Sequence, residues 1–265
     1  MIRLLALGLV VSVAAGCAGA PPAPGPVAGS VDDLVLPFDA YKPAPGQRAL
    51  LDTARRALVT RCLSRRGGRR GPVPLAPPDP GNSRRYGVAD PAQAAEFGYH
   101  LPAAQAEPAG SGKRAKKARR HPAGLRACEE RAAVRLASSG QAPWTWLARR
   151  DARTLERSAA RPEVRQAVTG WVACMRSAGH PYPSPEAAIG DPRWALDKPV
   201  ISADEKRTAI ADTACKWSSG LVARWFAADA ALQRRLVHKH AGRFALLRAD
   251  LNERVRRATT LLDRS

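Results

Sequence analysis

The fold is decided by residues 202–262, which read SADEKRTAIADTACKWSSGLVARWFAADAALQRRLVHKHAGRFALLRADLNERVRRATTLL. Apolar residues recur every three or four positions along this stretch, as they do on one face of an α-helix. The stretch contains no proline, and Ser202 is followed three residues later by Glu205, which is the pattern of a capping box. We therefore predict a long C-terminal helix over residues 203–262 and a mostly α-helical protein.

An unbroken helix of about 60 residues would extend for about 90 Å, which exceeds the width of a domain of this size. The helix must therefore either project from the domain or break. The candidate break points are Gly220, Gly242 and the alanine-rich residues 227–231.

Shorter helices are predicted elsewhere from the same periodicity and from helix start and stop signals. They cover residues 47–66, a short segment from Pro91 to Gly98, residues 125–139, a stretch beginning near Trp144, and a segment from Pro162 to Gly179. Residues 180–201 are rich in proline and contain Trp194, so we expect an irregular loop that wraps over the helix before it. Only 5% of the residues are aromatic and many apolar residues are alanine, which favours a thin helical core over a β-barrel.

The N-terminus has the pattern of an export signal. Arg3 precedes the apolar residues 4–13, and Ala-Ala-Gly at residues 14–16 directly precedes Cys17. The apolar run is too short to span a bilayer. Residues 13–17 (VAAGC) resemble the lipobox of bacterial lipoproteins, although Ala stands where leucine is usual at the third position before the cysteine. The resemblance implies a signal peptide over residues 1–16 and a lipid anchor on Cys17.

Residues 17–30 are rich in proline, glycine and alanine, and they predict a disordered tether between the lipid and the domain. The expected location is the extracytoplasmic face of the cell membrane, with attachment through the N-terminal lipid. Ordinary secretion is the alternative.

The four remaining cysteines are an even number in an oxidising compartment, which favours two disulfides. A zinc site is the alternative, but the close CxxC pairs that such sites usually contain are missing here. Four cysteines allow three connectivities, and their spacing alone does not choose among them.

A weak internal repeat helps with the pairing. Residues 62–67 (CLSRRG) match residues 174–179 (CMRSAG), and an Ala-Cys pair follows each of them, at Cys128 and at Cys215. If the two copies are equivalent, the bridges are Cys62–Cys128 and Cys174–Cys215. The copies would span residues 44–140 and 160–265 of a single helical domain over residues 31–265.

The second copy resembles secreted lipoproteins of actinobacteria, a group with no established activity. The similarity is carried by residues 171–179 (WVACMRSAG), 181–185 (PYPSP) and 211–215 (ADTAC), with further similarity at 36–41 (LPFDAY) and 86–91 (YGVADP). It implies a helical, disulfide-bonded lipoprotein at the cell surface.

Charge points to an anionic partner. The 265 residues contain 43 Lys and Arg against 23 Asp and Glu, a net charge of +20 that excludes an acidic protein. The densest run of cations lies in residues 101–124, which we predict to be a disordered insertion because they lack apolar periodicity. The candidate contact residues are Lys113, Arg114, Lys116, Lys117, Arg119 and Arg120. Because an exported protein rarely meets nucleic acid, the expected partners are anionic lipid headgroups or phosphate-rich wall polymers.

Complete signatures of catalysis or of cofactor binding are missing from the sequence. Residues 110–113 (GSGK) lack the earlier glycine and the final hydroxyl residue of a phosphate loop, and no GxSxG motif occurs. His238 and His240 diverge on a helix because they are two residues apart, so no metal site is expected. The six tryptophans are expected in the core, with a ligand groove as the alternative.

These observations predict a membrane-anchored extracytoplasmic lipoprotein with a non-catalytic binding or scaffolding role, no enzymatic activity, no cofactor and an unknown protein partner. A solute- or ligand-capture lipoprotein is the first alternative. A cell-wall hydrolase is the second, and it would need an acid/base constellation that the sequence does not display.

Overall fold

The predicted C-terminal helix is three helices in a computed structural model, which describes residues 30–66, 73, 81–102, 124–138 and 142–264. They are α8 (Ala203–Ser218), α9 (Leu221–Lys239) and α10 (Ala241–Asp263). Gly220 separates α8 from α9 in the left-handed conformation, with φ of 69°, which glycine adopts without steric penalty. The second break is at His240 (φ −122°, ψ 36°), two residues before the predicted Gly242. The alanine-rich residues 227–231 lie inside α9.

The expectation of a mostly helical protein is confirmed, and the described ranges contain no strand beyond one isolated bridge between Arg85 and Gly87. The remaining helices are α1 (Pro45–Arg65), α2 (Pro91–Phe97), α4 (Leu125–Leu136), α5 (Trp144–Ala159), α6 (Pro162–Ser177) and α7 (Pro185–Ile189). Helix α7 lies within the segment that we expected to be irregular. Its N-cap is Ser184, whose side chain accepts a hydrogen bond from Ala187 N at 3.2 Å.

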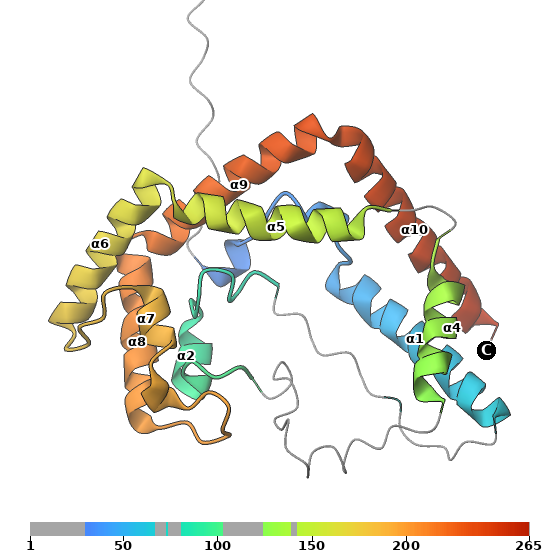
Figure 1. Cartoon of the computed structure of the whole chain (residues 1–265), viewed down its shortest axis with the longest axis horizontal. Coiled ribbons are helices and arrows are strands. Elements are labelled where there is room, and N and C mark those ends of the chain that lie inside the picture. Colours follow the sequence, from blue (N-terminus) through green and yellow to red (C-terminus); the bar gives the residue numbers. More distant parts are fainter. Residues whose placement is uncertain (1–29, 67–72, 74–80, 103–123, 139–141, 265) are drawn as a thin grey trace, which may run out of the picture.

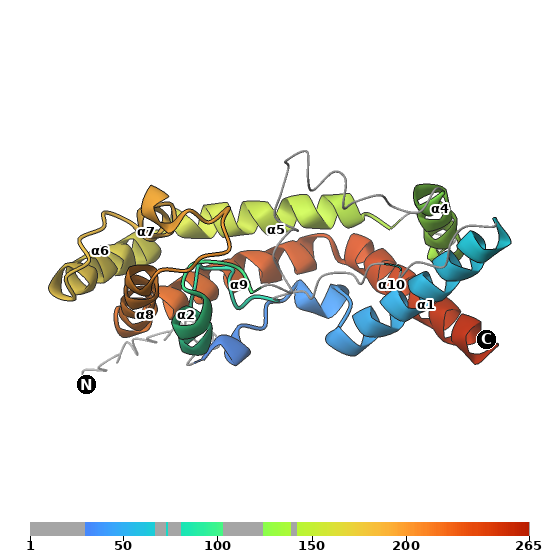
Figure 2. The same ribbon diagram turned by 90° about the horizontal axis from the view of Figure 1, so that it is seen from below.

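The molecule is elongated, and α5 and α9 lie side by side along its middle (Figures 1 and 2). One end contains α6, α7, α8 and α2, and the other contains α1, α4 and α10. Helix α10 lies in the second predicted copy of the repeat, but it packs against α1 and α4 from the first copy. The two halves of the sequence therefore contact each other at this end.

The largest apolar cluster joins α6, α8, α9 and the segment before α2, and it buries Trp171, Trp194 and Trp225. These three tryptophans are core residues. Trp144 and Trp146 are partly buried against a separate cluster around Phe244.

The predicted disulfide pairing is confirmed. Cys62–Cys128 joins α1 to α4, and Cys174–Cys215 joins α6 to α8. The two copies are not equivalent in position, because Cys128 lies in the first turn of α4 whereas Cys215 lies near the end of α8.

Buried charged side chains of α8 bind the backbone on both sides of α2, at Val88 before the helix and at Tyr99 after it. Lys216 and Asp212 are both fully buried and form an ion pair of 2.7 Å, and Lys216 Nζ also donates to Val88 O at 3.0 Å. Ser202 caps the helix as predicted, by accepting from Glu205 N at 3.0 Å. The Glu205 side chain, however, does not complete the capping box. Its Oε1 instead accepts from Tyr99 N at 2.8 Å, because the end of α2 packs against this face of α8.

Candidate functional site

Cys17 and the predicted contact residues Lys113, Arg114, Lys116, Lys117, Arg119 and Arg120 all lie outside the described residues. The lipid anchor and the basic cluster therefore stay predictions. Within the described part of the chain, cationic side chains gather around cavities that the sequence analysis did not identify.

The most basic of these, here called the arginine cavity, lies where α1, α4 and α10 meet and has a volume of about 380 Å³. Arginines supply most of its lining, and Leu58, Thr260 and Leu261 supply the rest. The arginines are Arg61, Arg135, Arg256, Arg257 and Arg264. None of the described residues that line the arginine cavity is acidic, so this lining attracts anions.

One carboxylate partly balances these charges. Glu253 accepts from Arg257 Nε at 2.7 Å and also pairs with Arg256. Arg257 additionally donates to Ala137 O, where α4 ends, so its guanidinium is tied to α4 and α10 together. A planar guanidinium offers several parallel N–H donors that match the oxygens of phosphate. The chemistry of the arginine cavity therefore suits a phosphate-bearing ligand.

The sequence offered only a weak signal for this site. Arg264, which caps α10, follows the adjacent Arg256 and Arg257 by about two helical turns, so the three side chains can reach the same side of the helix. Arg61 and Arg135 come from helices distant in the sequence, and only the packing of α1 and α4 against α10 brings them to the same place.

A second basic cavity, of about 430 Å³, lies between α5 and α9. Arg150, Arg153 and Arg157 line it from α5 and Arg235 lines it from α9, with Glu156 as the acidic residue among the lining. Cationic cavities thus occur at the middle of the molecule as well as at one end.

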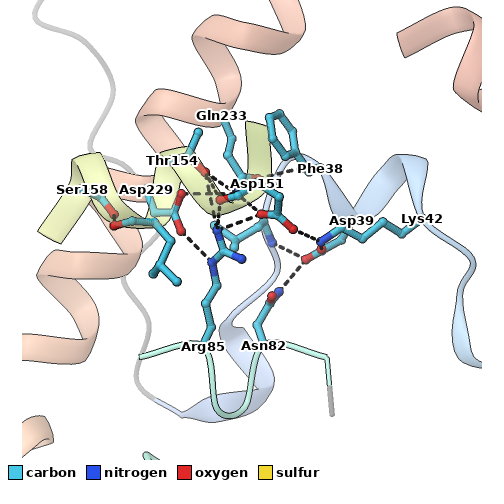
Figure 3. Close-up of polar contacts among 12 residues, drawn as sticks. Phe38, Asp39, Lys42, Asn82, Arg85, Asp151, Thr154, Ser158, Asp229 and Gln233 are labelled. Carbon is cyan, nitrogen blue, oxygen red and sulfur yellow. Dashed lines mark hydrogen bonds and ion pairs between the residues drawn. The ribbon is translucent and has the colours of Figure 1, made fainter. Parts of the chain in front are cut away.

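A buried polar network fixes the middle of the molecule (Figure 3). Arg85 Nε donates to Asp229 Oδ2 at 2.7 Å, and an Arg85 terminal nitrogen pairs with Asp151 at 2.8 Å. Asp229 is fully buried, and Tyr86 also donates to it at 3.2 Å. Burial and the neighbouring Asp229 charge raise the pKa of Tyr86. Because Arg85 pairs with a carboxylate on α5 and with another on α9, it joins both helices to the loop that precedes α2.

The network continues to the N-terminal segment (Figure 3). Lys42 Nζ lies 2.8 Å from Asp151 Oδ2 and 3.2 Å from Asp39 Oδ1. Asn82 Nδ2 donates to Asp39 Oδ2 and to Leu34 O, each at 2.6 Å. These bonds hold residues 34–42 against the loop at residue 82, beside a cavity of about 1010 Å³.

The described residues include no group of three or more His, Cys, Asp or Glu side chains arranged to hold a metal ion. Among the helices that the structure describes, none combines the length and the apolar character needed to cross a membrane.

No protein-family model matches the chain, and no curated protein or solved structure shows significant similarity to it.

Proposed function

We propose that this protein is a lipoprotein, anchored through Cys17 to the extracytoplasmic face of the cell membrane, that binds phosphate-rich anionic polymers without transforming them. The observation that carries the proposal is the arginine cavity, where the described lining contains five arginines and no acidic residue. The two disulfides are typical of an oxidising compartment outside the cytoplasm.

Location and charge act together in this proposal. A lipid anchor keeps the domain close to the membrane, where phosphate groups of headgroups and wall polymers are concentrated, so individually weak contacts suffice. The predicted basic run at residues 113–120 would add further contacts of the same kind. Binding should weaken as salt rises, because counterions compete for the phosphates.

The binding test uses the full chain in zwitterionic detergent micelles, titrated with inorganic polyphosphate at low ionic strength. The cavity variant changes three lining residues to Gln: Arg61, Arg135 and Arg256. The control variant removes the same charge from exposed positions on α6 and α9: Arg165, Arg176 and Arg224. Each cation near a polyanion contributes about 1 kcal/mol, so the cavity variant should bind roughly 100-fold more weakly. The control should lose much less.

An equal loss in both variants would show that only overall charge matters, and unchanged binding in the cavity variant would exclude the arginine cavity. Replacing the six cations between Lys113 and Arg120 by Gln then tests whether the basic run carries the binding.

The anchor is tested separately. Replacing Cys17 by Ala should move the protein from the membrane fraction to the soluble fraction of exported protein, because the thiol that carries the lipid is gone. Unchanged membrane association in the Cys17→Ala variant would disprove the lipid anchor without bearing on polyphosphate binding.

A further inference from the structure

A cavity of about 1010 Å³, here called the α1 groove, is larger than the two basic cavities described above. It lies between residues 35–45, the first half of α1 and the turn at residues 81–82, with Arg234 reaching in from α9. Its volume is at the upper end of the range that small-molecule sites occupy, roughly 300–1,000 Å³. It is distinct from the arginine cavity, which lies further along α1 and α10.

The walls of the α1 groove are held by the network of Figure 3. Asp39, which lines the groove, accepts from Leu36 N at 2.8 Å and is bonded to both Lys42 and Asn82. The neighbouring Phe38 N also donates to Oε1 of the buried Gln233 at 3.0 Å, which ties the same segment to α9. Hydrogen bonds within the protein therefore hold these walls in place, which lowers the entropic cost of binding a ligand between them.

Apolar side chains and prolines make up much of the lining. Val35 is 68% exposed, although it is a large hydrophobic residue, and Pro37, Ala40, Pro45 and Ala49 continue the same surface. An apolar surface of this kind gains free energy when a hydrocarbon chain covers it.

Cationic groups stand among these apolar residues. Arg56 and Arg234 both line the groove. Arg56 Nε is paired with Asp52 at 3.0 Å, whereas the exposed Arg234 makes no ion pair within the described ranges. Arg234 is thus available to an anionic group of a ligand, and the Asp39 carboxylate is already occupied by Lys42 and Asn82.

The groove also lies near the predicted anchor in sequence. Ser30, the first described residue, stands thirteen positions after Cys17, and a chain of that length spans at most about 45 Å. If Cys17 is acylated as proposed above, the α1 groove stays within reach of the membrane surface. The available ligand that combines hydrocarbon with a negative charge is then a membrane phospholipid.

We propose that the α1 groove binds one anionic phospholipid, with an acyl chain against Val35, Pro37 and Ala49 and the headgroup phosphate at Arg234. This proposal rests on the proposed membrane anchor, which places the groove close to membrane lipid. Binding in the groove does not require the arginine cavity. The protein would then hold a lipid molecule at one site and a polymeric anion at another.

Native mass spectrometry of the full chain, released from zwitterionic detergent, tests the proposal with phosphatidylglycerol and phosphatidylcholine of identical acyl chains. Two variants perturb the groove: Ala49→Trp fills it from the exposed side of α1, and Arg234→Gln removes the free cation. Their matched controls are Ala245→Trp on the exposed side of α10 and Arg224→Gln on α9. Circular dichroism melts of all four variants verify that they fold.

We expect one phosphatidylglycerol per chain, held at least tenfold more tightly than phosphatidylcholine. Ala49→Trp should weaken the retention of both lipids at least tenfold, and Arg234→Gln should weaken that of phosphatidylglycerol alone about fivefold. The controls should match the wild type, and Ala49→Trp should bind polyphosphate normally. Polyphosphate binding is therefore measured separately. Loss of lipid retention alone argues against the α1 groove, and failure of the wild type to bind polyphosphate argues against the proposed function.

Three results would overturn the proposal: equal retention of the two lipids, retention unaffected by Ala49→Trp, or an equal loss in Ala245→Trp. A fourth would reassign the site. If phosphatidylglycerol binds only after Cys17→Ala, the groove is occupied by the protein's own acyl chains and not by a separate phospholipid.

Discussion

Replacing Lys216 by Met should lower the free energy of unfolding by about 3–5 kcal/mol, the usual effect of breaking a buried ion pair from one side. The Lys216 ammonium is fully buried, lies 2.7 Å from Asp212 Oδ2 and donates to Val88 O at 3.0 Å. Methionine fills similar space but donates no hydrogen bond. The equally buried Asp212 would keep Trp171 Nε1, at 2.9 Å, as a donor, but it would lose its counter-charge. Burial lowers the pKa of Lys216 against the opposing effect of Asp212, so the carboxylate is what favours the charged amine.

Urea unfolding of the full chain, followed by tryptophan fluorescence, measures the effect. With a denaturant slope of about 2–3 kcal/mol per molar for a protein of this size, the midpoint should fall by roughly 1–2 M. The double variant Lys216→Met/Asp212→Leu removes both charges and should recover at least half of the loss, because no unpaired ion remains buried. The reasoning fails if Lys216→Met loses less than about 1 kcal/mol, or if the double variant is as unstable as the single one.

Three other substitutions test particular local structures. Gly98→Ala should lower stability by about 1–3 kcal/mol in a thermal melt, because φ is +56° and the added Cβ would lie 2.6 Å from the buried carboxylate of Glu205. The control Gly46→Ala has nothing within 4 Å of its added Cβ and should change stability by less than about 1 kcal/mol. The pKa of Tyr182 is raised to about 12 by burial and by its hydrogen bond to a carboxylate, so ultraviolet titration should show a transition near pH 12 that Tyr182→Phe removes. Its contribution to stability should be complete below pH 10 and should decline as pH rises to 12; a tyrosine at this position that titrates at pH 10 would contradict the structure. Replacing Cys62 and Cys128 by Ala removes a bridge between residues 66 positions apart and should lower the free energy of unfolding by up to about 4 kcal/mol in chemical denaturation, because the unfolded chain gains conformational freedom; a loss below about 1 kcal/mol would contradict this account.

The sequence by itself determined the helical class and most of the helix starts, and its internal repeat favoured the disulfide pairing that the structure contains. These depend on short-range patterns. A proline or capping residue followed by apolar positions at spacings of three and four specifies a helix wherever it occurs, as at Pro91, Pro162 and Ser202. The matching Cys segments around residues 62 and 174 indicated the pairing, although the paired cysteines occupy different positions in their helices.

The tertiary structure alone decided how the long C-terminal pattern is divided and which charges are buried. Periodicity continues through His240, so the sequence could not place the break there, and α10 turns to pack against α1 and α4. Glu205 has the position of a capping residue in the sequence, yet it is buried against Tyr99. A side chain in the first turn can satisfy its own helix or a neighbouring segment, and the packing of α2 on α8 selects the second.

The candidate sites also depend on the tertiary structure. The arginine cavity combines residues from α1, α4 and α10, and the α1 groove combines residues from the N-terminal segment, α1 and α9. The local sequence pattern instead points to residues 113–120, because cations follow one another closely there. Electrostatic attraction depends on distance through space. Arginines separated by more than a hundred residues therefore form one site only when the helices that carry them pack together.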